Sequence, residues 1–172
     1  MAKNRTTLAE LALFGILGAL TFGMKVVMAP LPNIEPVSLM VMLFAVTFGR
    51  KALYPIYVYV LLEFLLYGFN LWSINYLYIW AVLSLGAWLL RREEHPLVWA
   101  MLSGSFGLLF GALCAPVDVV IGGGWYAVGR WISGIPFDLL HGAGNFVIAL
   151  GLFVPLRRLM DRLYQSMRSN HR

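Results

Sequence analysis

The positions of the basic residues constrain this chain more than any other feature of its sequence. Eleven of the thirteen Lys and Arg residues lie at or beyond the ends of apolar stretches. They form four groups: Lys3 and Arg5, Arg50 and Lys51, Arg91 and Arg92, and a C-terminal set of Arg157, Arg158, Arg162, Arg168 and Arg172. If the stretches cross a membrane in alternating directions, all four groups fall on one side, as the positive-inside rule requires of cytoplasmic segments. The pattern predicts an all-α integral membrane protein, a compact bundle of six transmembrane helices with both termini in the cytoplasm.

We expect one transmembrane domain over residues 1–172. The predicted crossings are residues 8–28, 35–49, 52–69, 74–90, 96–114 and 135–156, followed by a basic cytoplasmic tail over 157–172. With 60% hydrophobic and 12% charged residues, the chain has too little polar sequence for a soluble shell. Its net charge of +5 comes from anchoring residues, so we do not interpret it as a nucleic-acid-binding surface.

Two connections on the outer side are unusual. Fifteen residues of helix span only about 22 Å of a hydrocarbon core about 30 Å thick, so the second crossing is too short. The segment before it, residues 30–36 with three prolines, would then reach membrane depth and line a cavity, although a tight surface turn is an equal alternative. The second connection, residues 115–134, contains Gly122, Gly123 and Gly124 in a row, which predicts a mobile flap over a ligand.

Two stripes of small residues predict close helix approaches. The first crossing carries Ala12, Gly15, Ala19 and Gly23. The fifth carries Ser103, Gly107, Gly111 and Ala115. Small side chains let a second helix pack closely in a membrane. Packing inside this bundle and docking to a partner subunit are both open for each stripe, and two stripes allow one use of each kind.

The third crossing gives the strongest indication of a binding site. Tyr59, Glu63, Tyr67 and Asn70 follow one another at i, i+4, i+8 and i+11, so they share one helix face. A charged residue inside a membrane costs about 2.5–3.5 kcal/mol on insertion scales and usually faces a cavity, a partner charge or a substrate. We expect Glu63 to bind substrate, with a structural ion pair to Lys25 as the alternative.

The sixth crossing repeats this pattern with Asp138, His141 and Asn145 on one face. One His and one Asp are too few ligands for a metal site, so we expect either hydrogen bonds to a ligand or a buried network between helices. An intramembrane enzyme using Asp138 and His141 as acid and base would lack a nucleophile or a metal set. Cys114, the single cysteine, excludes an intramolecular disulfide.

Further polar and aromatic residues fall in the expected outer half of the bundle. The remaining predicted substrate-binding residues are Lys25, Asn33, Glu35, Asn75, Asp118, Trp125 and Arg130. The whole set holds four acids and two bases beside aromatic rings, which suits a small planar polar molecule. A neutral or cationic heteroaromatic would suit the acids, but Lys25 and Arg130 could equally receive a carboxylate or phosphate. The pairing of these charges in the folded chain decides between them.

The chain resembles the substrate-binding (S) components of energy-coupling factor (ECF) transporters, the vitamin-uptake family of bacterial ABC transporters. The resemblance covers essentially the whole chain and rests on its length, the six expected crossings and the Gly15-Ala19-Gly23 stripe. It also rests on Leu31-Pro32-Asn33-Ile34-Glu35-Pro36-Val37 and on Gly134-Ile135-Pro136-Phe137-Asp138 with His141, Gly144 and Asn145. The stripe contains glycines where the family pattern is usually written with two alanines.

The resemblance implies a multi-pass protein of the bacterial plasma membrane that captures a vitamin or related micronutrient at the outer face. Its partners would be a membrane scaffold (T) subunit, docked on the stripe of Ala12, Gly15, Ala19 and Gly23, and two cytoplasmic ATPase subunits. The chain itself would be no enzyme, and it has no glycine-rich phosphate-binding motif with its lysine and no expected cofactor. The competing hypothesis is a structural or assembly subunit of a membrane complex, similar to the cell-shape protein MreD.

Overall fold

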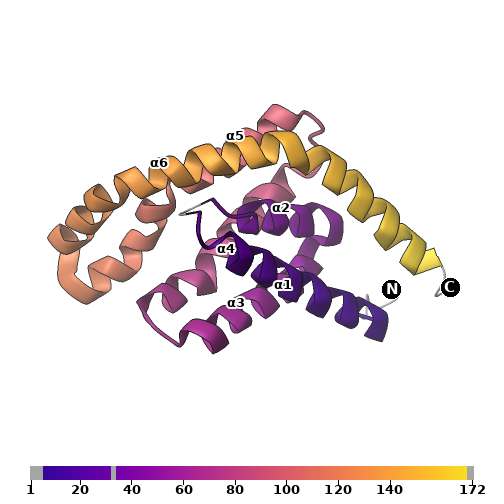
Figure 1. Cartoon of the computed structure of the whole chain (residues 1–172), viewed down its shortest axis with the longest axis horizontal. Helices are drawn as coiled ribbons and strands as arrows, with labels where there is room; N and C mark the ends of the chain where they lie inside the picture. The colour runs from indigo at the N-terminus through magenta and orange to yellow at the C-terminus, as the bar shows by residue number, and fades with distance from the viewer. Residues whose placement is uncertain (1–5, 32–33, 170–172) are drawn as a thin grey trace.

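The computed structural model describes residues 6–31 and 34–169, and its regular structure is entirely helical over these ranges. Figure 1 shows α1 and α3 lying along one side of the molecule and the long α6 along the other. The elements in chain order are α1 (Leu8–Met28), α2 (Val37–Phe48), the 3-10 turn η1 (Gly49–Ala52), α3 (Leu53–Tyr67), α4 (Leu71–Leu89), α5 (Pro96–Leu108) and α6 (Phe110–Ser169). The predicted all-α class is confirmed.

Side-chain caps fix where several helices begin. Thr7 accepts a hydrogen bond from the Glu10 backbone N–H, and the Glu10 carboxylate accepts one from the Thr7 N–H, which closes a capping box at the start of α1. Asn70 and Ser73 form the same reciprocal pair at the start of α4. Pro96 begins α5, a position where its missing N–H costs nothing.

The number of membrane crossings differs from the six that the apolar runs predicted. The described helices join into four continuous stretches, and three of them are long and apolar enough to cross a membrane: Leu8–Met28, Val37–Tyr67 and Pro96–Ser169. α2 has only 12 residues, about 18 Å of helix, and continues through η1 into α3. α4 is not among the three stretches, and the Asn, Ser and Tyr residues along it reduce its apolar character.

The prediction of an irregular flap over residues 115–134 is wrong, because the backbone of this segment is largely helical. This segment is helical on both sides of Gly123, which has φ 81° and ψ 177° and interrupts α6. Only Gly123 of the three consecutive glycines adopts a conformation that other residues avoid, so the remaining two stay in helix. α6 therefore folds back on itself as a helical hairpin, seen at the left of Figure 1. The expected fifth crossing, 96–114, is also interrupted, because α5 ends at Leu108.

α2 forms the centre of the molecule. Ten of its twelve residues are buried, and it contacts α1, α3, α4 and α6. A helix that is apolar on all sides is typical of a core rather than a surface position. Because protein surrounds α2, its short length need not match the thickness of a bilayer.

Glycines allow two close approaches between helices. A Cβ on Gly107 of α5 would lie 2.7 Å from the backbone nitrogen of Gly142 in α6, so the second stripe packs inside the molecule. A Cβ on Gly18 of α1 would lie 2.7 Å from the carbonyl oxygen of Pro55 and from the Cβ of Val58 in α3. In both places an added methyl group would meet a neighbouring helix backbone.

One end of the molecule is tied by polar contacts, and we call it the Glu10 end. The buried Glu10 accepts hydrogen bonds from Lys51 Nζ at 2.7 Å and from Tyr164 O–H at 2.6 Å. Arg157 donates to the carbonyl oxygens of Arg91 and Glu93, at 2.6 Å each. These contacts join the start of α1, η1, the α4–α5 connection and the end of α6. The start of α1 and the end of α6 lie close together at the right of Figure 1.

Candidate ligand-binding cavity

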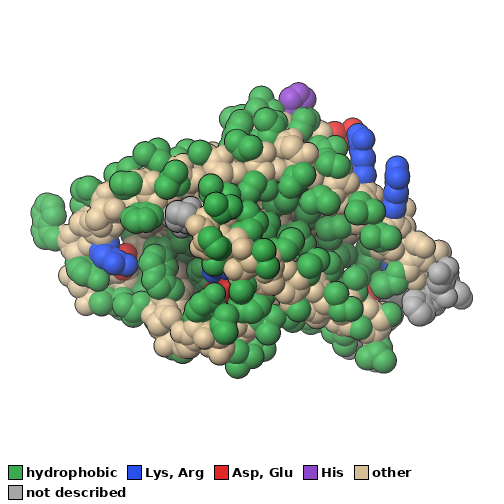
Figure 2. Space-filling model, viewed as in Figure 1, with side chains coloured by type: hydrophobic (Ala, Val, Ile, Leu, Met, Phe, Trp, Pro, Cys, Tyr) green, Lys and Arg blue, Asp and Glu red, His purple; other side chains and the backbone are tan. Residues whose placement is uncertain are grey.

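A cavity of about 1020 Å³ opens at the end of the molecule opposite the Glu10 end. Its walls come from the end of α1, the α1–α2 connection, α3, α4, the start of α6 and the second arm of the α6 hairpin. The volume is at the upper end of the roughly 300–1,000 Å³ typical of small-molecule sites. In Figure 2 the surface around the hollow at the left is mostly hydrophobic, and a few charged side chains lie within it.

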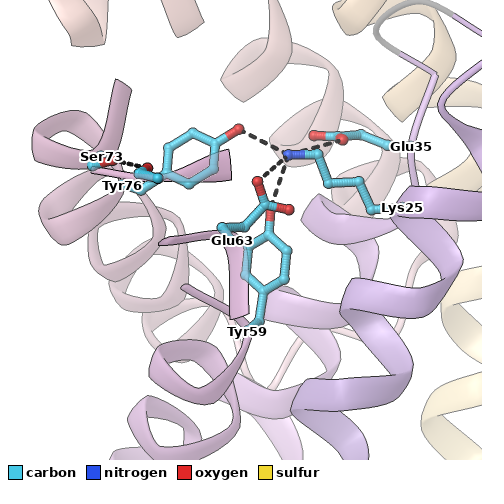
Figure 3. A network of polar contacts seen from close by, with 7 residues as sticks. Lys25, Glu35, Tyr59, Glu63, Ser73 and Tyr76 are labelled. Atoms are coloured by element: carbon cyan, nitrogen blue, oxygen red, sulfur yellow. Dashed lines mark hydrogen bonds and ion pairs between the residues drawn. The ribbon is translucent and has the colours of Figure 1, made fainter. Parts of the chain in front are cut away.

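A lysine is the centre of the polar part of this cavity. Lys25 Nζ lies 2.9 Å from Glu63 Oε2, 3.2 Å from the Tyr76 hydroxyl and 3.4 Å from the Tyr59 hydroxyl. Glu35 Oε2 lies 4.0 Å from the same nitrogen. We call these five residues the Lys25 cluster. Figure 3 shows that α1, the α1–α2 connection, α3 and α4 all contribute to it.

The two tyrosines of the Lys25 cluster also present their rings to the ammonium group. Lys25 Nζ is 5.1 Å from the centroid of the Tyr76 ring and 5.8 Å from that of Tyr59. Both distances are within the range of a cation–π interaction. The pKa of the Glu35 carboxyl lies above its ordinary value, because burial and the nearby Glu63 raise it more than Lys25 lowers it. The ion pair between Glu63 and Lys25, which the sequence offered as the alternative to substrate binding by Glu63, is present, and both residues line the cavity.

The opposite wall holds the acid and the histidine of α6. Asp138 accepts hydrogen bonds from the backbone N–H of Gly111, at 3.1 and 3.2 Å to its two oxygens, near the start of α6. His141 is 5% exposed and lines the cavity, with its ring 5.0 Å from that of Phe110. Asp138 thus accepts hydrogen bonds from a backbone N–H in the first turn of α6. His141 Nε2, by contrast, is buried without a hydrogen-bond partner among the described residues.

A second ion pair lies at the rim of the cavity. Arg130 Nε is 3.9 Å from Asp118 Oδ1, and the guanidinium lies 6.0 Å from the centre of the Trp72 ring. The Arg130 side chain is half exposed, so this pair contributes little to stability, as is usual for exposed pairs. The two arms of the α6 hairpin are joined by this pair, because Asp118 and Arg130 lie on either side of Gly123.

The cavity brings together most of the predicted substrate-binding residues. The lining includes Lys25, Glu35, Glu63, Tyr67, Asn70, Asn75, Asp118, Arg130, Asp138 and His141. Tyr59 is fully buried behind the lining, where it contacts Lys25 and Tyr76. Asn33 lies outside the described residues. The cavity is also lined by Tyr76, Trp72 and Trp131, which are not among the predicted substrate-binding residues.

Two predicted substrate-binding residues lie elsewhere. Trp125 is 90% exposed, next to the turn of the α6 hairpin, and does not line the cavity. Asn145 is 2% exposed and donates to Ser38 Oγ at 3.0 Å and to the Ser103 carbonyl at 3.3 Å, so it joins α6 to α2 and α5. Of the two roles expected for this residue, Asn145 therefore has the second, a buried hydrogen-bond network between helices.

The first small-residue stripe faces outward. Ala12 and Ala19 are exposed, and Cβ atoms added to Gly15 or Gly23 would meet nothing within 4 Å. Gly18, on another face of the same helix, makes the contact with α3 instead. Ala19 and Gly23 also line a shallow apolar groove on this face.

The fold and the cavity define an all-α chain with three helical stretches able to cross a membrane and a polar, aromatic cavity at one end. Among the residues that the structure describes, no group of three or more His, Cys, Asp or Glu side chains is arranged to hold a metal ion. No protein-family model, curated protein or solved structure matches this chain.

Proposed function

We propose that this chain is the substrate-binding component of an ECF-type transporter in a bacterial plasma membrane, and that it captures a vitamin-like molecule at the outer face. The observation that carries the proposal is the cavity of about 1020 Å³, whose lining includes Lys25, Glu63 and His141 beside aromatic side chains. Glu63 Oε1 and His141 Nε2 have no hydrogen-bond partner among the described residues. Buried polar atoms are costly when left unpaired, and a ligand that bonds both would remove that cost.

The distribution of basic residues supports a membrane orientation with the cavity outside. Contacts at the Glu10 end involve Lys51, Arg91 and Arg157, which come from three different basic groups of the sequence. Lys25 and Arg130, the two cations outside these groups, both line the cavity at the other end. The positive-inside rule then assigns the Glu10 end to the cytoplasm and the cavity to the outside.

The outward stripe supports docking to a partner. Gly15 and Gly23 leave the surface of α1 open, so another helix could approach this face closely. The proposed partners are a scaffold subunit on this face and two cytoplasmic ATPases that supply the energy. The stripe is equally expected of an MreD-like assembly subunit, but such a subunit has no need of a polar, aromatic cavity of this size.

A thermal-shift screen of the purified protein in detergent tests the proposal. Its panel is the water-soluble vitamins and their precursors. A ligand at 100 times its dissociation constant stabilises the folded state by about 2.7 kcal/mol. We expect at least one compound to raise the melting temperature. If a folded sample responds to no compound, the assembly-subunit hypothesis is favoured instead.

Two matched variants locate the binding site of any compound that responds. Glu63→Gln removes a carboxylate charge at the cavity, and Glu10→Gln removes an equally buried carboxylate, also paired with a lysine, at the opposite end. We expect Glu63→Gln to weaken binding at least about tenfold, the loss of one charged hydrogen bond. Glu10→Gln is expected to lower stability and leave the affinity unchanged. Equal affinities in the two variants would place the binding site elsewhere.

A further inference from the structure

We infer that the cavity selects an organic cation or an uncharged ring compound rich in hydrogen-bond donors, and rejects phosphate esters and carboxylates. This inference rests on the proposed function and names the charge class of its ligand. It follows from how the charged groups of the cavity are paired.

The lining carries more negative than positive charge. Its cations are Lys25 and Arg130, and its acids are Glu35, Glu63, Asp118 and Asp138. With every carboxyl counted as ionised and histidine as neutral, the formal sum is 2 − 4 = −2. An anionic ligand in the cavity would meet this excess, and like charges at close range repel one another.

Each cation of the lining already has an acidic neighbour, with which an incoming anion would compete. An ammonium group has three N–H donors, and Lys25 has three hydrogen-bond acceptors within 3.4 Å, namely Glu63, Tyr59 and Tyr76. Arg130 lies 3.9 Å from Asp118, with the Trp72 ring beside its guanidinium. To bind a phosphate or carboxylate, Lys25 would have to leave a buried carboxylate unpaired, which is a costly exchange.

Two buried side-chain atoms of the lining residues have no hydrogen-bond partner among the described residues. Glu63 Oε1 is a carboxylate oxygen without a donor, and it can only accept while ionised. His141 Nε2 is also unpartnered, and a neutral imidazole can present it as an acceptor. A ligand with amino or ammonium hydrogens that displaced the atoms covering Glu63 Oε1 would supply the donor that this oxygen lacks.

The aromatic side chains of the lining also favour a cationic ligand. Tyr76, Trp72, Trp131 and Phe110 line the cavity. The Tyr76 ring already lies 5.1 Å from the Lys25 ammonium, which shows that its position suits a cation. A planar cation would gain from stacking and from the negative faces of these rings together.

Matched ligand pairs test the charge class directly. The probes are thiamine with thiamine monophosphate, pyridoxine with pyridoxine phosphate, riboflavin with FMN, and nicotinamide with nicotinate. Each pair shares its rings and differs in one phosphate or carboxylate group. In any pair that binds, we expect the form without the added anion to bind at least about tenfold more tightly by isothermal titration.

A charge variant gives opposite expectations for the two ligand classes. Lys25→Met changes the lining charge from −2 to −3, so it should widen the affinity ratio within a pair. If Lys25 were an anion receptor, the unmodified protein would prefer the anionic member of a pair, and Lys25→Met would reverse that preference. Lys51→Met, which breaks the equivalent ion pair at the Glu10 end, is the matched control and should leave the ratio unchanged. If Lys25→Met fails to fold, Glu35→Gln should narrow the ratio instead, because it removes one negative charge from the lining.

The outcomes separate this inference from the proposed function. Tighter binding of a phosphorylated or carboxylated member overturns the charge class but leaves a substrate-binding component in place. Absence of binding by every probe, in a folded sample, overturns both. Preference for the cationic or neutral members, widened by Lys25→Met, supports both.

Discussion

A pair of glycine substitutions on α1 tests which face of this helix packs inside the molecule. The variants are Gly18→Ala and Gly15→Ala. A Cβ at position 18 would lie 2.7 Å from the Pro55 carbonyl oxygen and the Val58 Cβ, whereas at position 15 it would meet nothing within 4 Å. Both changes replace glycine by alanine in the same helix, and alanine is about 1 kcal/mol more favourable there. The propensity gain therefore cancels when the two variants are compared.

The remaining difference is the cost of the contact with α3. Forcing extra atoms into a packed interface typically costs about 1–3 kcal/mol, and a backbone carbonyl cannot rotate away as a side chain can. At about 2–4 °C per kcal/mol for a chain of this size, Gly18→Ala should melt several degrees below Gly15→Ala. The measurement is thermal unfolding in detergent followed by intrinsic fluorescence. Gly23→Ala is the second control and should behave like Gly15→Ala, since its added Cβ also meets open space. Identical melting of the Gly15→Ala and Gly18→Ala variants would refute the assignment of the inner and outer faces of α1.

Three further substitutions test other parts of the structure. Asn145→Ala should lower the free energy of unfolding by about 1–3 kcal/mol, because it leaves the buried Ser38 hydroxyl without its partner, and it should not change ligand affinity. Tyr164→Phe should cost about 1.5–3 kcal/mol through the lost hydrogen bond to the Glu10 carboxylate, as measured by denaturant unfolding. Gly123→Ala should destabilise the α6 hairpin by about 1–3 kcal/mol, because φ of 81° with ψ of 177° is essentially restricted to glycine, and faster proteolysis at the hairpin would reveal it. Unchanged stability in any of these variants would contradict the contact or conformation that it probes.

The sequence predicted the helical class and the gathering of polar residues because both follow from local patterns. Apolar runs bounded by charge predict helices, and α1 runs over Leu8–Met28, the range expected from its apolar run. Residues such as Glu63 and Asp138 attract attention wherever they occur in apolar helices, so ten of the fourteen predicted substrate-binding residues line one cavity.

The errors come from information that is not local. Three consecutive glycines look like a loop, but only the fold determines which of them must turn, and the answer is Gly123. Asn145 follows His141 by four residues, so it was expected on the same helix face as a binding residue. Its amide instead donates a hydrogen bond to Ser38, more than a hundred residues away in the sequence. Trp125 was predicted to bind substrate with the other outer residues, but in the hairpin of α6 it is exposed and does not line the cavity. The pairing of Lys25 with Glu63 likewise depends on the packing of α1 against α3.

The rate at which Cys114 reacts with a small thiol reagent tests most directly whether this cavity is the ligand site. Cys114 is the only cysteine of the chain and lines the cavity with 5% of its surface exposed, so labelling by methyl methanethiosulfonate reports on one position. We predict that a compound found in the thermal-shift screen slows this labelling in proportion to its occupancy. A compound that stabilises the protein at saturation but leaves the labelling rate unchanged would contradict the account, because it would bind outside the cavity.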